Sequence, residues 1–274
     1  MKFLTQCLQH SRKIMRKNYS VALNGMNIHP DQATSFDEPC ILVNENDEII
    51  GKASKRDCHM VGGDKSNKGL LLHRAFSVFI FNSKGEMLVQ RRSSQKVTFP
   101  GEFANACCSH PLYVKEEMQE DGRDNQEENK VTAIGVKRAA SRRLNFELGI
   151  PTDMTKPENF LYLTRFHYHS LSGVDDNVKT ETLLRKGNPV WGEHEIDYIL
   201  VLKGDMEIKP NPNEVMEVRL ITRSGLVPFL ESLSQKGIKI TPWFHLIVKT
   251  WLPLWWDNLH QLEKFQDHHT IHRL

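Results

Sequence analysis

An amphipathic segment over Gly135–Leu148 constrains the fold of this 274-residue chain more than any other feature of its sequence. Its apolar residues recur at positions 136, 140, 144 and 148, once per helical turn, and Gly149 follows as a residue that commonly ends a helix. Apolar runs at Ala75–Phe81 and Met87–Arg91 flank a polar turn ahead of this segment, which predicts a β-hairpin. An amphipathic helix that follows strands of this kind predicts a sheet covered by helices.

Further strands and helices are predicted along the rest of the chain. The segments Cys40–Val43 and Glu48–Lys52 form a second expected hairpin, and three later runs read as strands: Phe160–Tyr168, Ile196–Leu202 and Val215–Ile221. Helices are predicted over Leu226–Ser234 and over the Trp-rich segment Trp243–Trp256, where Thr241 can cap and Pro242 can take the first helical position. We therefore predict an α/β (α+β) fold, with a mixed β-sheet between helices, added N-terminal strands and a C-terminal helix.

Three segments fall outside this pattern. Residues 1–37 form a predicted extension whose first half is basic and amphipathic, with no acidic residue before Asp31, as in a mitochondrial transit peptide; a disordered basic arm is the alternative. Two polar stretches, at about 115–130 and 172–188, are predicted surface loops within a single domain at 38–274. The terminal His272-Arg273-Leu274 is similar to the peroxisomal tripeptide Ser-Lys-Leu. We expect a mitochondrial location, with peroxisomal or cytosolic forms as alternatives.

The composition excludes several classes of protein. Lysine plus arginine exceed aspartate plus glutamate by only two charges, which argues against a general nucleic-acid-binding protein. The longest apolar runs are too short to cross a bilayer. The five cysteines are an odd number without a repeated spacing, so we expect reduced thiols and no disulfide framework.

The run Asn105-Ala106-Cys107-Cys108-Ser109-His110-Pro111 carries the first chemical signal. It places a thiol two residues from a candidate metal ligand, and a cation can set the pKa of a neighbouring thiol so that it transfers protons near neutral pH. By itself the run is ambiguous, because a reduced core segment with one hydrogen-bonded histidine has the same composition.

A second signal is a set of candidate metal ligands. If the segment around Glu193-His194-Glu195 is a strand, both glutamates point to one face and His194 points to the other. Three imidazoles and two carboxylates suit a divalent ion such as Mn²⁺, Zn²⁺ or Mg²⁺, with Mg²⁺ the less natural choice. The candidates are His59, His73, His110, Glu193 and Glu195. The alternative is that these are scattered surface residues among thirteen histidines.

A third signal is cationic. Guanidinium and ammonium groups at these positions match the oxygens of a phosphate or diphosphate, although solvated side chains are the simpler explanation for Arg91 and Arg142. The cationic candidates are Lys55, Arg91, Arg92, Lys96, Arg142 and Arg143. Glu147, at the end of the predicted helix, is either a surface carboxylate or a ligand of a diphosphate-bound Mg²⁺.

Five motifs in order resemble those of the type I isopentenyl-diphosphate Δ-isomerases, a family of the Nudix superfamily. The resemblance extends from about Glu38 to the C-terminus and rests on His73–Ser77, Thr98–Gly101, Cys107–Pro111, Arg142–Ile150 and Trp191–Tyr198. The segment Arg142–Ile150 is similar to a degenerate Nudix helix in which Arg143 and Phe146 replace two glutamates of the hydrolase motif Arg-Glu-Leu-x-Glu-Glu-x-Gly. This loss argues against pyrophosphate cleavage, so a Nudix pyrophosphohydrolase and an inactive metal-binding scaffold remain only as alternatives.

The resemblance also implies roles for individual residues. It implies a Nudix-like fold and a divalent ion held by His59, His73, His110, Glu193 and Glu195. It implies a Mg²⁺ at Glu147 that bridges to the substrate diphosphate, which is bound by Lys55, Arg92, Lys96 and Arg143, with Ser109 nearby. It implies catalytic roles for Cys108, Glu195, Trp243 and Tyr168, whereas Cys107 takes no part.

The activity implied by the resemblance is a 1,3-allylic rearrangement that converts isopentenyl diphosphate into dimethylallyl diphosphate in isoprenoid and sterol biosynthesis. Protonation of the alkene gives a tertiary carbocation, and removal of a proton from C2 completes the reaction. Whether Cys108 or Glu195 donates first stays open from the sequence. The expected partner is this small-molecule substrate, with no nucleic acid, no membrane and a monomeric state.

Overall fold

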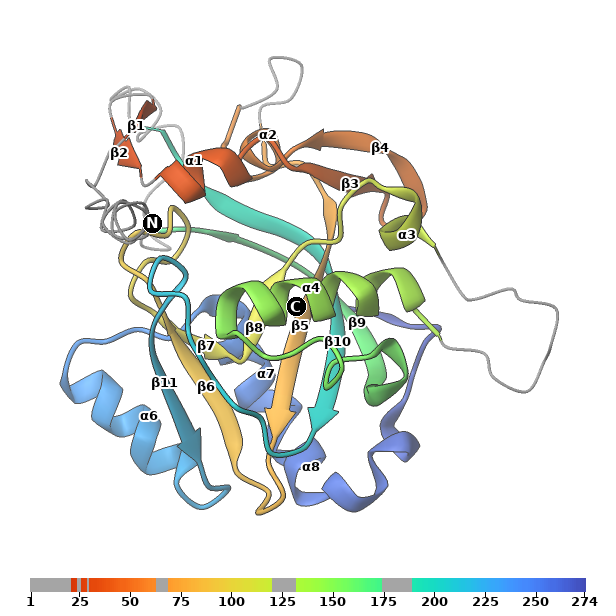
Figure 1. The fold of residues 1–274 in the computed structure, drawn as a ribbon, viewed down its shortest axis with the longest axis vertical. Helices are drawn as coiled ribbons and strands as arrows, with labels where there is room; N and C mark the ends of the chain where they lie inside the picture. The colour runs from red at the N-terminus through yellow and green to blue at the C-terminus, as the bar shows by residue number, and fades with distance from the viewer. Residues whose placement is uncertain (1–20, 24–25, 29, 63–68, 120–131, 174–188) are drawn as a thin grey trace, which may run out of the picture.

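The computed structural model describes residues 21–23, 26–28, 30–62, 69–119, 132–173 and 189–274 (Figure 1). The basic segment at the N-terminus and most of the two polar stretches lie outside the described residues. No described helix has both the length and the apolar character needed to cross a membrane. The four described cysteines are free thiols, as expected.

Strands form a two-stranded sheet and a large mixed sheet. The described strands are β1 (Val21–Leu23), β2 (Met26–Ile28), β3 (Pro39–Val43), β4 (Ile49–Ser54), β5 (His73–Phe81), β6 (Met87–Arg92), β7 (Phe103–Asn105), β8 (Cys107–Ser109), β9 (Phe160–Leu171), β10 (Gly192–Lys203), β11 (Val215–Ile221) and β12 (Ile271–Arg273). The large sheet has the order β11-β6-β5-β10-β9-β12, with the β3–β4 hairpin and β8 attached to β5 and β7 attached to β6. Both predicted hairpins are confirmed as antiparallel pairs.

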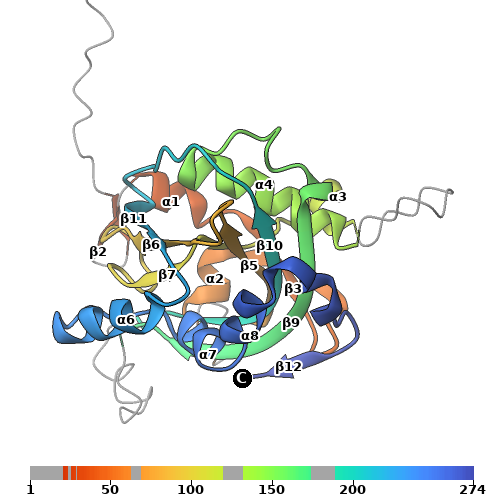
Figure 2. The same cartoon turned by 90° about the horizontal axis from the view of Figure 1, so that it is seen from below.

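The helices cover both faces of this sheet. They are α1 (Pro30–Ser35), α2 (Lys55–His59), α3 (Lys115–Met118), α4 (Ile134–Leu148), α6 (Leu226–Gln235), α7 (Pro242–Thr250) and α8 (Leu252–Asp257), with short 3₁₀ turns at Pro157–Asn159 and Leu259–Phe265. Seen from below, α4 lies on one side of β5 and β10 and the α7–α8 pair lies on the other (Figure 2). The predicted arrangement of a mixed sheet between helices is confirmed.

The central strands β5 and β10 run parallel and are buried on both faces. All nine residues of β5 are buried, as expected for a strand with helices on both sides. Phe76, Val78 and Ile80 pack toward α4, while Phe79 and Phe81 pack toward α7 and α8. The helix predicted from periodicity is confirmed as α4, which ends at Gly149 with a left-handed φ of 66°.

The predicted single helix over Trp243–Trp256 is wrong, because the segment forms two helices. The helical conformation is interrupted at Trp251, which ends α7 and precedes α8, two residues before Pro253. A proline has no N–H to donate and its ring clashes with the carbonyl four residues earlier, so α7 cannot continue through Pro253. Pro242 takes the first helical position of α7 as predicted, but the Thr241 side chain makes no capping hydrogen bond.

Two segments are partly helical although we predicted a loop at about 115–130 and an extension at 1–37. Lys115–Met118 form α3, and the buried Glu117 accepts hydrogen bonds from the Leu112 backbone N–H and from Arg142. Near the end of the expected extension, Pro30–Ser35 form α1, and Gln32 Nε2 donates to Glu214 Oε1 at 2.8 Å. Contacts with residues far along the chain stabilise both short helices, and local sequence patterns do not report such contacts.

Candidate active site and metal centre

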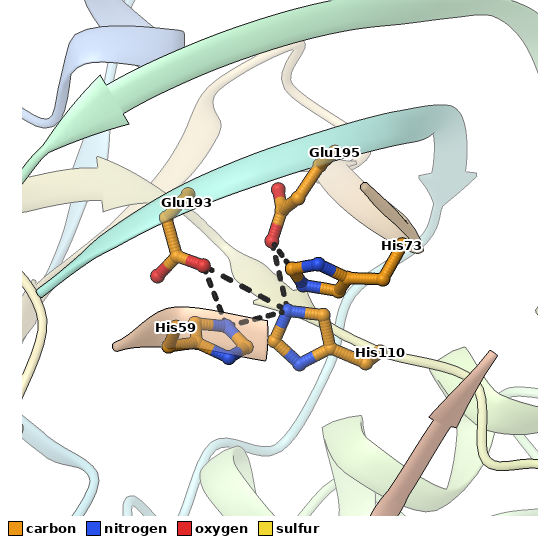
Figure 3. Close-up of side chains that lie close together, drawn as sticks. All are labelled: His59, His73, His110, Glu193 and Glu195. Atoms are coloured by element: carbon orange, nitrogen blue, oxygen red, sulfur yellow. Dashed lines mark hydrogen bonds and ion pairs between the residues drawn. The ribbon is translucent and has the colours of Figure 1, made fainter. Parts of the chain in front are cut away.

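Three histidines and two glutamates converge at one end of the central strands (Figure 3). His59 ends α2, His73 begins β5, His110 follows β8, and Glu193 and Glu195 lie near the start of β10. All five side chains are buried, and one ligand atom from each lies within 4.8 Å of the others. The structure therefore brings together all five metal ligands predicted from the sequence.

Strand geometry explains how this cluster is built. Glu193 and Glu195 are two residues apart on β10, so their side chains point to the same face. His194 points to the other face, where its Nε2 lies 3.0 Å from His167 Nε2, as the alternation predicts. The parallel register of β10 with β5 places Glu195 directly beside His73. The pairing of β5 with β10 thus brings His73 and both glutamates together.

Close contacts join the imidazoles to the carboxylates. His59 Nε2 lies 2.6 Å from Glu193 Oε2, and His110 Nε2 lies 2.8 Å from Glu195 Oε1. The Nε2 atoms of His59 and His110 are 3.2 Å apart (Figure 3). Two imidazole nitrogens at this separation need either a shared proton or a shared cation.

The tautomers of two histidines favour a cation. His59 Nδ1 lies 2.6 Å from the Lys55 carbonyl oxygen, and His73 Nδ1 lies 2.8 Å from that of Leu71. Because a carbonyl only accepts, both Nδ1 atoms carry hydrogen, and in the neutral ring the lone pair lies on Nε2, which faces the cluster. Within the described residues, His73 Nε2 is buried without a hydrogen-bond partner. The donor set therefore fits a divalent metal ion.

The pKa values in the cluster reflect this crowding. Burial lowers the pKa of His73, but the neighbouring Glu195 carboxylate outweighs burial and raises it to about 9. Burial, together with the charges of His59 and His73, holds the pKa of His110 well below its usual value. The pKa values of His73 and His110 are thus shifted in opposite directions, and a metal ion would bind these imidazoles only after they release their protons.

A pocket opens beside the cluster and contains most of the other predicted site residues. Its lining includes Lys55, Arg92, Lys96, Cys108, Ser109, Tyr168 and Trp243, together with Glu193 and Glu195. The Arg92 guanidinium carbon lies 5.7 Å from the centre of the Trp243 ring. The pocket lining therefore combines the cationic side chains of Lys55, Arg92 and Lys96 with the aromatic ring of Trp243.

The two neighbouring cysteines have different surroundings. Cys107 is fully buried in the core beneath α4, whereas Cys108 points to the other face of the sheet and lines the pocket. Cys108 Sγ lies 3.0 Å from Asn105 Oδ1 and 3.1 Å from Trp243 Nε1. Burial and then the charge of Asp197 raise the pKa of Cys108, so this thiol carries a proton at neutral pH. The predicted distinction between the two cysteines matches this geometry.

Tyr168 and Glu195 are cross-strand neighbours in the antiparallel pair of β9 with β10. The Tyr168 hydroxyl donates a short hydrogen bond to Glu195 Oε2, and both side chains are at least nine-tenths buried. The hydrogen-bonding tyrosine expected at this position therefore contacts one of the metal-cluster carboxylates.

Arg143 and Glu147 are buried and do not line the pocket. Arg143 Nη2 donates to Glu147 Oε1 at 2.6 Å, one helical turn along α4. It also lies 3.4 Å from Glu214 Oε2, and this carboxylate pairs with Lys96 Nζ at 2.5 Å. Burial raises the pKa of Glu214, but the charges of Lys96 and Arg143 outweigh it and lower the pKa to about 2.

Several residues at this site were not predicted. Glu214 occurs in a polar stretch without periodicity, so no local pattern indicates that it is buried. Asn105 begins the cysteine-containing run, but the pattern of that run assigns it no role. No sequence pattern indicates that Gln32 and Phe36, from α1 and just after it, line the pocket. Arg142 pairs with Glu117, and Arg91 donates to the Gly101 carbonyl, so both half-buried side chains have partners within the fold and are not the solvated side chains that the sequence favours.

Comparisons with known proteins place these features in a family. A family model described as the NUDIX domain matches residues 71–244. Isopentenyl-diphosphate Delta-isomerase 1 of Bos taurus is 45% identical over 237 residues, which cover 86% of this chain and 92% of that protein. The protein of the same name from Mesocricetus auratus is 42% identical over 92% of this chain and 99% of its own length. Isopentenyl-diphosphate delta-isomerase 2 of Homo sapiens is 38% identical over 89% of this chain and 95% of that protein.

Proposed function

Because the chain belongs to the isopentenyl-diphosphate Δ-isomerases of the NUDIX superfamily, we propose that it converts isopentenyl diphosphate into dimethylallyl diphosphate. The observation that carries this proposal is that Cys108, Glu195 and Trp243 line one pocket beside the histidine–glutamate cluster. A thiol, a carboxylate and an aromatic face are the groups that a proton shift through a carbocation requires.

Cys108 and Glu195 are the proton-transfer pair of this proposal. One of them gives a proton to C4 of the alkene, which leaves a tertiary cation at C3, and the other removes a proton from C2 to form the new double bond. No other bond forms or breaks, so the diphosphate remains intact. Well-positioned acids and bases each contribute about 10²–10⁴-fold to a rate.

The cation is the high-energy species, and the pocket is built to stabilise it. The Trp243 ring is 2% exposed and lies on the pocket wall, where an aromatic face attracts a cation by about 2 kcal/mol when water is excluded. The buried Tyr168 holds the Glu195 carboxylate by a hydrogen bond, so its orientation is fixed. Exclusion of water also protects the cation from capture.

His59, His73, His110, Glu193 and Glu195 would hold a Mn²⁺, Zn²⁺ or Mg²⁺ ion, which supplies positive charge beside the reacting carboxylate. Glu147, which pairs with Arg143 and does not line the pocket, is the residue that would hold a second ion, Mg²⁺, and this ion would supply positive charge toward the diphosphate. We expect that a chelator with high affinity for divalent ions reduces isomerisation to the background rate, and that adding one divalent ion back restores it. Metal analysis of the treated protein is the check, and a metal-free sample with full activity would contradict the expectation.

Lys96 is expected to bind the diphosphate through its ammonium group. Lys96→Gln should raise the KM for isopentenyl diphosphate about 10- to 100-fold with a smaller change in kcat, because a hydrogen bond to a charged group contributes about 1.5–3 kcal/mol. Steady-state kinetics measure this. Lys209→Gln is the matched control, since Lys209 forms its ion pair at the surface with both side chains about 70% exposed. An unchanged KM in Lys96→Gln would remove Lys96 from the diphosphate site.

The test of the proposed function is incubation of the purified chain with isopentenyl diphosphate and Mg²⁺, followed by proton NMR of the product. Dimethylallyl diphosphate without released phosphate is the expected result. Release of phosphate from nucleoside diphosphate derivatives, without isomerisation, would instead indicate a Nudix pyrophosphohydrolase. No reaction with either substrate, at full metal occupancy, would indicate an inactive scaffold.

A further inference from the structure

Asn105 lies between the thiol and the indole of the pocket. It is the last residue of β7 and is fully buried. Its Oδ1 accepts a hydrogen bond from Cys108 Sγ at 3.0 Å and another from Trp243 Nε1 at 3.2 Å. Trp243 Nε1 also lies 3.1 Å from Cys108 Sγ. One amide oxygen thus joins two side chains from different elements, β8 and α7.

The orientation of this amide is fixed from behind. Asn105 Nδ2 donates to the Val78 carbonyl at 3.0 Å and to the Cys107 carbonyl at 3.2 Å. If the amide were flipped, its oxygen would face two carbonyl oxygens, and its NH₂ group would face the Trp243 N–H. The flipped arrangement would leave buried groups unpaired, at about 1–3 kcal/mol for each group. The oxygen of Asn105 therefore points to Cys108 and Trp243.

We propose that Asn105 is a positioning residue of the isomerisation, which holds the Cys108 thiol and the Trp243 ring in one fixed relative geometry. This inference rests on the proposed function of the same site. Asn105 does not line the pocket, so it acts only through the two groups that do. The bond from Sγ–H to Oδ1 sets the resting direction of the thiol hydrogen, and the bond from the indole N–H sets the tilt of the ring.

The geometry matters because both groups act on adjacent carbons of one small substrate. The thiol exchanges a proton with an end of the alkene, and the ring faces the cation that forms next to it. A displacement of about 1 Å in such a site can cost about 10²-fold in rate. Phe99 packs against the same ring edge to face, with the two ring centres 5.3 Å apart, but a phenyl ring has no hydrogen-bonding group that could hold the thiol.

Two substitutions separate positioning from a general effect on folding. Asn105→Asp keeps an oxygen toward Cys108 and Trp243 but loses the NH₂ group that binds the Val78 and Cys107 carbonyls. Asn105→Ser is too short to reach either side chain of the pocket but creates no charge against those carbonyls. A positioning role predicts that kcat per folded molecule falls about 10- to 100-fold in Asn105→Ser and less in Asn105→Asp, with KM nearly unchanged in both.

A purely structural role predicts the reverse order, because Asn105→Asp disturbs the contacts with the fold most. Thermal unfolding midpoints and the folded fraction are measured alongside the kinetics of each variant. If kcat follows the order of the unfolding midpoints, or if kcat of Asn105→Ser lies within about twofold of the unsubstituted protein, the inference is overturned. If only Asn105→Ser folds, its kcat per folded molecule against that twofold limit decides the question. If only Asn105→Asp folds, a loss in kcat above about 100-fold, larger than the loss expected for Asn105→Ser, overturns the inference.

A double substitution tests the same inference independently of stability. Trp243→Phe keeps an aromatic face but removes the N–H that bonds Asn105. If Asn105 acts through Trp243, the losses in kcat of Asn105→Ser and Trp243→Phe combine to less than their product. Ser77→Ala is the comparison, because Ser77 Oγ lies 3.5 Å from Cys108 Sγ, a thiol that Trp243 also contacts, but Ser77 has no described hydrogen bond with Trp243 itself. The coupling of Ser77→Ala with Trp243→Phe should therefore be weaker than that of Asn105→Ser, because Asn105 bonds both side chains. If the kcat losses of Asn105→Ser and Trp243→Phe multiply in the double variant, the inference is overturned. Inactivity of the unsubstituted protein would instead refute the proposed function.

Discussion

Replacing Cys108 by alanine is expected to reduce kcat for isopentenyl diphosphate at least about 10³-fold while KM changes little. In the proposed mechanism the thiol is one half of the proton-transfer pair, so its loss should remove one of the two proton transfers. The diphosphate contacts proposed for Lys55, Arg92 and Lys96 do not involve Sγ, so substrate affinity should persist. Stopped assays of product by NMR, with an inhibitor titration to count folded sites, measure both parameters.

Cys107→Ala is the matched control for this substitution. Cys107 is the adjacent residue of β8, has the same side chain, and is fully buried on the opposite face of the sheet against α4. Its removal leaves a small cavity in the core and should cost about 1 kcal/mol of stability or somewhat more, with kcat nearly unchanged. Comparable loss of kcat in both variants would show that the strand, and not the Cys108 thiol, controls activity.

Much of the fold follows from local patterns in the sequence. The one-per-turn apolar spacing of Gly135–Leu148 identified α4, and the alternation around Glu193 and Glu195 placed both carboxylates on one face of β10. These predictions succeed because the side-chain period of a helix or strand is a local property of the chain. The interruption near Pro253 also follows from a local property, since a proline within a helical pattern ends the helix at or before the residue that precedes it.

The metal cluster required more than local pattern. His59 ends α2, His73 begins β5 and His110 follows β8, and nothing in their spacing along the chain indicates that they meet. The resemblance to a known family brought them together, and the register of β5 with β10 then supplied the physical reason.

Contacts between distant positions account for what the sequence did not predict. Asn105 and Trp243 are 138 positions apart, and Gln32 and Glu214 are 182 positions apart. Helix α1 is six residues long, and α3 is four. Helices of this length have little stability in isolation, so packing against the rest of the fold decides whether they form.

Glu195→Gln is expected to abolish isomerisation, with kcat reduced at least about 10³-fold even at saturating divalent metal. Burial raises the pKa of Glu195, but its contacts with His73 and Tyr168 outweigh burial and lower the pKa, so the group is a carboxylate in the folded protein. A glutamine preserves the shape but cannot accept a proton from C2 or donate one to C4. It also replaces an anionic metal ligand by a neutral one, so metal binding should weaken about tenfold or more.

Glu193→Gln separates these two effects. Glu193 is on the same face of β10 and contacts His59, but it makes no described hydrogen bond with Tyr168. Metal affinity, measured by calorimetric titration, should therefore fall in both variants, because each loses one anionic ligand of the same cluster. Saturating metal should restore most of the kcat of Glu193→Gln and little of that of Glu195→Gln, since in the proposed mechanism only Glu195 also transfers a proton. If saturating metal restored the kcat of both variants, Glu195 would be a metal ligand only. Cys108 would then need another partner for proton transfer.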